Sequence, residues 1–215
     1  MDKQLVLTKL KELKEKSKKR NFSQSVDLIV NLKQLDLKKP EHKVDLFIAL
    51  PHSKGKSVKI CGLVDKELLK ESRENLDHTI SRDEFQNLNK NQIKKLSKEY
   101  DLFIAQANIM ADVAKFFGRT LGPRGQMPNP KAGCVVPGNM QLKPIKERLQ
   151  KMIRLQTKNE LIVKAMVGKD NMGDEEIASN VMALYSSLLS SLPQEKNNIR
   201  GVFIKLTMSA PVKVE

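Results

Sequence analysis

Apolar and polar positions follow two different periods in the first fifty residues. Over residues 3–20, leucines recur among basic side chains with neither Gly nor Pro, which predicts a helix with one apolar stripe. Residues 26–33 and 44–50 instead alternate apolar with polar side chains, which predicts two strands. We expect these strands to be joined as a hairpin across Lys38-Lys39-Pro40, and Pro51 to end the second strand.

The middle of the chain changes to strands that alternate with helices. Such alternation implies a parallel sheet covered by helices, so we predict a doubly wound, Rossmann-like α/β domain. The expected strands are residues 58–64, 78–81, 101–107 and 153–157, and the expected helices are residues 66–75, 82–99, 109–118 and 143–152.

The last part of the chain predicts a strand at 161–167, a helix at 174–192 and a strand at 202–208. Neither end segment could bury its apolar face alone, because each has too few elements. Joined, the two ends complete one α+β layer. The fold class is therefore α/β and α+β, in two domains.

Charge points to a polyanionic partner. The net charge is +14 and the sequence pI is about 9.7. So many positive side chains repel one another in the folded protein, and a bound nucleic acid would offset that repulsion. The alternative is a basic protein whose lysines only solvate it. Aromatic residues are 4% of the chain and Trp is absent, so folded RNA read by backbone and shape fits better than stacking of successive single-stranded bases.

Several classes of site find no support in the sequence. Cys61 and Cys134 lie far apart without a Cys-x-x-Cys pair, and His42, His52 and His78 lack metal-type spacing. We expect no metal, no cofactor and a reducing cytoplasmic location. No apolar run is long enough to span a membrane, and the start of the chain is charged, unlike a secretory segment.

Residues 121–131 read Leu-Gly-Pro-Arg-Gly-Gln-Met-Pro-Asn-Pro-Lys, which predicts a shaped loop. Its charges are Arg124 and Lys131, so it should face an anion. A rival interpretation is the phosphate loop of a nucleotide-dependent enzyme. That rival is disfavoured because neither phosphate-binding glycine motif is present and Asp65-Lys66 follows the first strand of the middle domain.

Four further motifs stand in order along the chain. Together with the loop, they resemble the signature of the family of large-subunit ribosomal protein one, in its archaeal version, over essentially the whole chain. The four are Arg20-Asn21-Phe22-Ser23-Gln24-Ser25-Val26-Asp27, Leu50-Pro51-His52 before a Gly-Lys pair, Val167-Gly168-Lys169 and Lys205-Leu206-Thr207-Met208.

The resemblance implies a domain made of residues 1–53 and 160–215 that binds large-subunit ribosomal RNA at the mobile stalk near the exit site. Residues 54–159 would be inserted as the second domain, facing the departing transfer RNA. It also implies repression of the protein's own operon through its messenger RNA, a monomer off the ribosome, and no catalysis. The chain would pass between the two domains twice, through two short connections with little shared core. We therefore expect a hinge at Ser53, Lys54, Gly55 and Asn159.

The resemblance also implies which residues bind RNA. From the sequence alone, Phe22 is either a core residue or an RNA contact. Val167-Gly168-Lys169 could likewise be an ordinary solvent-exposed turn. Ser209 stands where the family has glycine, which puts that contact in doubt. The expected ribosomal RNA site is Asn21, Phe22, Ser25, Gly168, Lys169, Lys205, Thr207, Met208 and Ser209. The expected transfer-RNA-facing loop residues are Gly122, Arg124, Gly125 and Lys131.

Overall fold

The computed structural model describes residues 1–39 and 42–215, so Pro40 of the expected hairpin turn lies outside the described residues. The chain forms two compact units. Unit 1 comprises Met1–Lys56 and Lys151–Glu215, and unit 2 comprises Ser57–Gln150. A separate cluster of buried apolar side chains lies in each unit.

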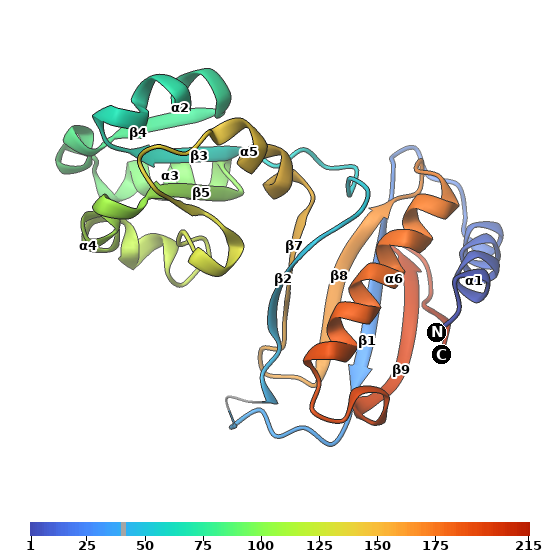
Figure 1. Ribbon diagram of the computed structural model, residues 1–215. Coiled ribbons are helices and arrows are strands. Elements are labelled where there is room, and N and C mark those ends of the chain that lie inside the picture. The colour runs from blue at the N-terminus through green and yellow to red at the C-terminus, as the bar shows by residue number, and fades with distance from the viewer. Residues whose placement is uncertain (40–41) are drawn as a thin grey trace. The chain divides into compact units, whose positions relative to one another are not determined.

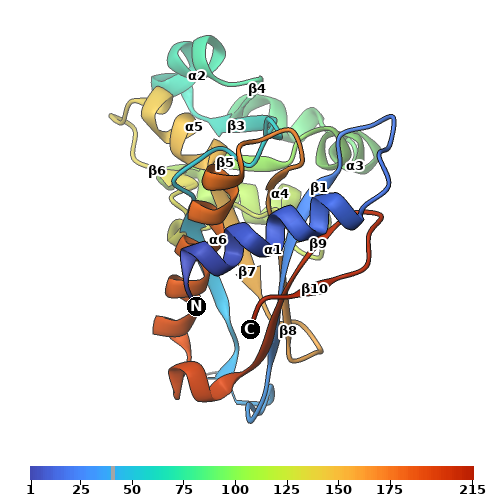
Figure 2. The ribbon, with the colours of Figure 1, turned by 90° about the vertical axis from the view of Figure 1, so that its right-hand side faces the viewer.

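Unit 1 is built on a four-stranded antiparallel sheet with two helices on one face (Figures 1 and 2). Every second residue of β1 (Ser25–Leu32) is buried against the helices, as the alternation predicts. The strands, in spatial order, are β10 (Val212–Lys213), β9 (Ile199–Leu206), β1 (Ser25–Leu32) and β8 (Ile162–Lys169), and the helices are α1 (Lys3–Lys16) and α6 (Asp174–Ser191).

The expected hairpin of the first two strands is wrong. β1 lies between β8 and β9, while β2 (Asp45–Ala49) pairs antiparallel with β7 (Met152–Gln156). β7 had been expected in the inserted domain, but Ile153 and Leu155 are buried in the core of unit 1. The second crossing between the units therefore falls between Gln150 and Lys151, and not near residue 159.

Unit 2 is the expected doubly wound domain, with a parallel sheet covered by helices on both faces (Figure 1). One face packs on α3 (Lys90–Glu99) and α4 (Met110–Leu121), and Gly62 on the other lies against Ser72 and Leu76. The strands, in spatial order, are β4 (His78–Ser81), β3 (Ile60–Val64), β5 (Leu102–Gln106) and β6 (Val135–Val136), and the helices are α2 (Leu69–Asn75), α3 (Lys90–Glu99), α4 (Met110–Leu121) and α5 (Leu142–Gln150).

The single helix expected over 82–99 is two elements. Residues Arg82–Asn87 form a 3-10 helix that buries Phe85, and α3 starts afresh after Asn89. Asn89 and Gln92 form a capping box, in which each side chain accepts a hydrogen bond from the other residue's backbone. Capping therefore overrides the continuous helical pattern. Shorter 3-10 turns lie at Lys66–Leu68, Ala107–Ile109, Pro130–Ala132 and Glu195–Asn198.

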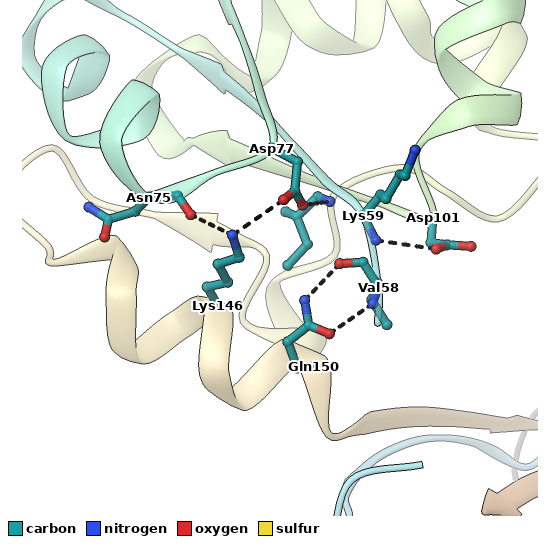
Figure 3. Close-up of polar contacts among 8 residues, drawn as sticks. Val58, Lys59, Asn75, Asp77, Asp101, Lys146 and Gln150 are labelled. Carbon is teal, nitrogen blue, oxygen red and sulfur yellow. Dashed lines mark hydrogen bonds and ion pairs between the residues drawn. The ribbon is translucent and has the colours of Figure 1, made fainter. Parts of the chain in front are cut away.

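The two chain segments that cross between the units are fastened to each other where they enter unit 2 (Figure 3). The Gln150 side chain accepts a hydrogen bond from the Val58 amide at 2.8 Å and donates one to the Val58 carbonyl at 2.7 Å. The Asp77 carboxylate also accepts from the Ile60 amide at 2.7 Å. These bonds hold the start of unit 2 to its last residue, Gln150.

The expected hinge residues do not all lie at a crossing. Ser53, Lys54 and Gly55 precede the first crossing, and Gly55 has a φ of +75°, which favours glycine. The Lys54 ammonium donates to the Met152 carbonyl at 3.2 Å. Asn159 instead lies in the connection between β7 and β8, inside unit 1, so its assignment to the hinge is wrong.

Candidate nucleic-acid interface

Three segments that are far apart in sequence meet at one end of the unit 1 sheet. β1 begins at Ser25, which pairs with Lys169 at the end of β8. The next residue, Val26, pairs with Gly168 on one side and with Leu206 on the other. The motifs at residues 20–27, 167–169 and 205–208 therefore form one continuous surface, which we call the sheet-end interface.

Gln24 ties the three segments together, and sequence reasoning missed it as a site residue. Its side chain is buried, with 4% of the residue exposed, and its Oε1 accepts a hydrogen bond from the Met208 amide at 3.0 Å. Its backbone carbonyl accepts from the Asp170 amide at 2.9 Å. The available signal was a polar residue at position 24, in phase with the buried positions 26, 28, 30 and 32.

The Thr207 hydroxyl is engaged within the protein. It accepts a hydrogen bond from the Ser25 amide at 3.1 Å and donates to the Ser25 carbonyl at 3.4 Å. The Thr207 amide donates to the same carbonyl at 3.1 Å. A hydroxyl oxygen has two lone pairs, so one lone pair of Thr207 remains to accept a hydrogen bond from a bound molecule. Thr207 therefore both holds the backbone of the interface and is exposed on it.

Ser209 closes the turn after β9 without backbone strain. Its hydroxyl accepts from the Leu206 amide at 2.9 Å, and its own amide donates to the Leu206 carbonyl at 3.1 Å. Its φ is negative, so this position does not require a glycine. The hydroxyl thereby fixes the backbone that carries Thr207 and Met208.

Two large apolar side chains are exposed beside these polar groups. Phe22 is 53% exposed and Met208 is 60% exposed. The interpretation of Phe22 as a core residue is therefore wrong. Asn21 is exposed next to Phe22, and Ser25 is half-buried. Both side chains therefore stand open to solvent within the motif segments.

Gly168 is buried and serves close packing. A Cβ built there would lie 3.1 Å from the Met172 Sδ and 3.2 Å from the Ile177 Cγ1, so β8 can pass this closely only without a side chain. The Met172 sulfur also accepts a weak hydrogen bond from the Lys169 amide at 3.4 Å. Gly168 therefore positions Lys169, whose side chain is half-buried.

Basic residues beyond α1 border the interface. A groove of about 470 Å³ is lined on one side by Lys16, Lys18 and Arg20 and on the other by the turn from Met208 to Val212. Lys16 is paired with Glu12 at 2.6 Å, whereas Lys18 and Arg20 are exposed. Lys16 is the last residue of α1, and Lys18 and Arg20 follow it, so these cations lie beside Met208.

Asp27 faces Lys205 across β1 and β9. Burial raises the pKa of the Asp27 carboxyl, and the Lys205 ammonium partly opposes that rise. The folded protein therefore holds the Asp27 proton more tightly than the unfolded chain, in which the carboxyl titrates near its ordinary pKa of 3.8. Ionised Asp27 costs stability, and this cost is absent below that pKa and grows as the pH rises through it.

Replacement of Asp27 by Asn should therefore stabilise the protein more at about pH 6 than at about pH 3. The neutral amide removes the cost of a buried charge at the higher pH, whereas at the lower pH both side chains are neutral. Urea unfolding of both proteins at the two pH values measures the difference. An equal change in the free energy of unfolding at both pH values would contradict the pKa shift.

The glycine and proline loop of unit 2 is fastened to α3. The Arg124 guanidinium donates to the Ser97 hydroxyl at 2.5 Å, and the Gln126 amide donates to the Tyr100 carbonyl at 3.0 Å. Gly125 has a φ of +67°, while Gly122 ends α4 with an ordinary negative φ. Arg124 and Lys131 remain exposed, so the loop is a shaped basic surface.

The rival nucleotide site would lie at the carboxyl ends of β3 and β5, where strand order reverses. There the buried Gln106 side chain accepts from the Asp65 amide at 2.9 Å and donates to Glu67 at 2.9 Å. These acidic side chains would repel a phosphate. Among the described residues, no group of three or more His, Cys, Asp or Glu could hold a metal ion, and no helix could cross a membrane.

The fold is that of a two-domain α/β protein with a basic interface at the end of one sheet. Residues 13–210 match the model of the ribosomal protein L1p/L10e family. The chain is 41% identical over its full length to the large ribosomal subunit protein uL1 of Pyrococcus horikoshii, covering 97% of that relative. It is similar at 40% identity to uL1 of Thermococcus kodakarensis and at 36% to uL1 of Methanocaldococcus jannaschii, covering 98% and 97% of them.

The chain therefore belongs to the ribosomal protein L1p/L10e family, and the resemblance read from its motifs is confirmed. This is a family of ribosomal proteins and not of enzymes. Its relatives are proteins of the large ribosomal subunit.

Proposed function

We propose that this protein is a structural constituent of the large ribosomal subunit in the cytoplasm and binds ribosomal RNA at the mobile stalk through the sheet-end interface. The observation that carries the proposal is the convergence of three motif segments around Gln24, which leaves Phe22 and Met208 exposed and Met208 beside cations. Hydroxyls, backbone groups and exposed apolar side chains suit folded RNA, whose 2′-hydroxyls and phosphates lie in a shallow groove.

Unit 2 would meet the transfer RNA that leaves the exit site. Support comes from the loop at 121–131, which carries exposed Arg124 and Lys131 on a backbone fastened to α3. The two crossings, before Ser57 and after Gln150, would bend as a hinge during this exchange, with Ser53, Lys54 and Gly55 beside the first of them. The family membership supports the arrangement, and the release of transfer RNA is part of the proposal.

The same interface would also bind the protein's own messenger RNA and repress its translation. An interface that reads shape, hydroxyls and phosphates accepts any RNA that presents the same fold. Repression by a messenger RNA copy of the ribosomal site follows from that property.

Binding to a ribosomal RNA fragment from the stalk base should weaken by roughly 100-fold between 50 and 200 mM salt, if about four cations meet phosphates. Four cations lie at the interface: Lys16, Lys18 and Arg20 line the groove beside Met208, and Lys169 ends β8. Fluorescence anisotropy over a salt series measures the slope. A flat response would contradict binding led by phosphates.

Thr207→Val is the matched variant for that experiment, since it removes no charge. It should lower the affinity by about 1 to 3 kcal/mol at every salt concentration, because the Ser25 amide loses its acceptor. The slope against salt should stay that of the natural protein. An unchanged affinity would remove Thr207 from the interface.

A further inference from the structure

The unit 1 sheet has a second face that its helices leave uncovered. α1 and α6 both pack on the side of the sheet that carries the core (Figure 2). Side chains of a strand alternate between faces, so Asp27, Ile29 and Asn31 of β1 point to the other side. All three are half-buried, whereas their neighbours Leu28 and Val30 are buried in the core.

Strand register places one ordered row of side chains across this open face. Ile29 pairs with Lys164 of β8 on one side and with Phe203 of β9 on the other. Phe203 in turn pairs with Lys213 of β10. Because residues paired in antiparallel strands share a face, the row reads Lys164, Ile29, Phe203, Lys213. The two lysine backbones are about 14 Å apart, three strand spacings.

Phe203 lies over a glycine in the same strand. A Cβ built on Gly201 would be 3.3 Å from the Phe203 Cε2 atom and 3.6 Å from its Cζ atom. The absence of a side chain there lets the ring lean along β9, with one side toward the sheet. The ring is half-buried and outside the core of unit 1, so its other side is accessible.

The charge on this face favours an anion. Lys164 and Lys213 have no ion-pair partner within residues 1–39 and 42–215, and both are exposed. Lys205 lies in the next row, opposite Asp27. A groove of about 330 Å³ runs along Asp27, Ile29 and Lys164. A second groove of about 490 Å³ shares Lys164 and is lined by Arg154 and Lys158 and by one acidic residue, Glu160.

We propose that this open sheet face binds one unpaired RNA nucleotide, whose base stacks on Phe203 while Lys164 and Lys213 neutralise the flanking phosphates. An aromatic ring on a middle strand, with cations on either side, suits an exposed base and its backbone. This row carries one ring, so we expect it to take one base and not a run of stacked bases. The inference rests on the proposed function in taking RNA as the partner, but it concerns a different surface from the sheet-end interface.

Phe203→Trp supplies a direct probe, because the chain has no other tryptophan and an indole ring also stacks on bases. Single-stranded hexa-adenylate should quench the fluorescence of this tryptophan to saturation, and an RNA duplex of equal length should not. Leu5→Trp is the control, since Leu5 is 40% exposed on α1, and its fluorescence should not respond. Equal quenching at both positions, or none at 203, would overturn the proposal.

Two variants test the contacts separately. Phe203→Leu keeps an apolar side chain without a ring and should weaken hexa-adenylate binding by roughly 5- to 100-fold. Lys164→Gln combined with Lys213→Gln should weaken it by about tenfold and flatten its salt dependence. Unchanged affinity in both would overturn the proposal, as would equal quenching by hexa-glutamate, which would make the face a docking site for acidic protein.

Thr207→Val separates this inference from the proposed function. It should lower the affinity for the ribosomal RNA fragment and leave hexa-adenylate quenching at position 203 unchanged. Loss of fragment affinity without any quenching would overturn the inference alone. If hexa-adenylate quenches the fluorescence and Thr207→Val leaves the affinity for the ribosomal RNA fragment unchanged, only the role of the sheet-end interface would be overturned.

Discussion

Replacing Gln24 by Met should lower the affinity for the ribosomal RNA fragment by roughly 10- to 100-fold. Methionine has a similar length but no amide oxygen, so the Met208 amide would lose its acceptor inside a buried site. Thr207 would keep its bonds to Ser25, but the Met208 backbone would lose its only bond to the segment before β1 that the structure describes. Equilibrium binding at fixed salt measures the loss.

Gln141→Met is the matched control, because Gln141 is exposed in unit 2 and far in sequence from the interface. It should bind as the natural protein does. Hydrogen exchange should show that the Met208 amide loses protection in Gln24→Met. Full affinity despite that loss would contradict the role assigned to Gln24.

Removal of β7 should abolish folding of unit 1. A chain that joins residues 1–53 to 160–215 follows the domain boundaries expected from the sequence, and it lacks the strand that pairs with β2. It also lacks the buried Ile153 and Leu155, which contribute about 1.5 to 3 kcal/mol each. The free energy of unfolding of a typical domain is about 5 to 15 kcal/mol. Losing both side chains together with the strand pairing should therefore leave unit 1 unfolded.

A chain that joins residues 1–56 to 151–215 is the control, since it follows the observed unit and keeps β7. It should unfold cooperatively in urea and keep most of the affinity for the ribosomal RNA fragment. Circular dichroism during urea titration compares the two chains. Cooperative unfolding of the chain without β7 would contradict the assignment of that strand to unit 1.

The sequence predicted most elements because their apolar periods are local. It could not predict the partners of β2, since alternation shows which side of a strand is buried and not which strand lies beside it. β2 and β7 have compatible patterns but are separated by about a hundred residues, and the intervening elements suggested that β7 continued the parallel sheet. The boundary between the two units was therefore decided by the pairing of β7 with β2, and not by the local propensity of β7 to form a strand.

The site shows the same division between local and distant information. The motifs correctly indicated which segments come together, and the structure brings Ser25, Gly168 and Leu206 into one pairing register. Motifs could not separate exposed Phe22 from the buried Gln24 two residues later, because burial depends on what covers each side chain. Gly168 likewise was expected at the RNA surface, and its contacts assign it to packing.

The most direct measurement is ultraviolet crosslinking of the protein to large-subunit ribosomal RNA in intact ribosomes, followed by identification of the crosslinked peptides. The sheet-end interface predicts crosslinks at residues 21–25, 168–170 and 205–209, and their loss in Gln24→Met. Crosslinks to ribosomal RNA found only in unit 2, or none at all, would contradict it.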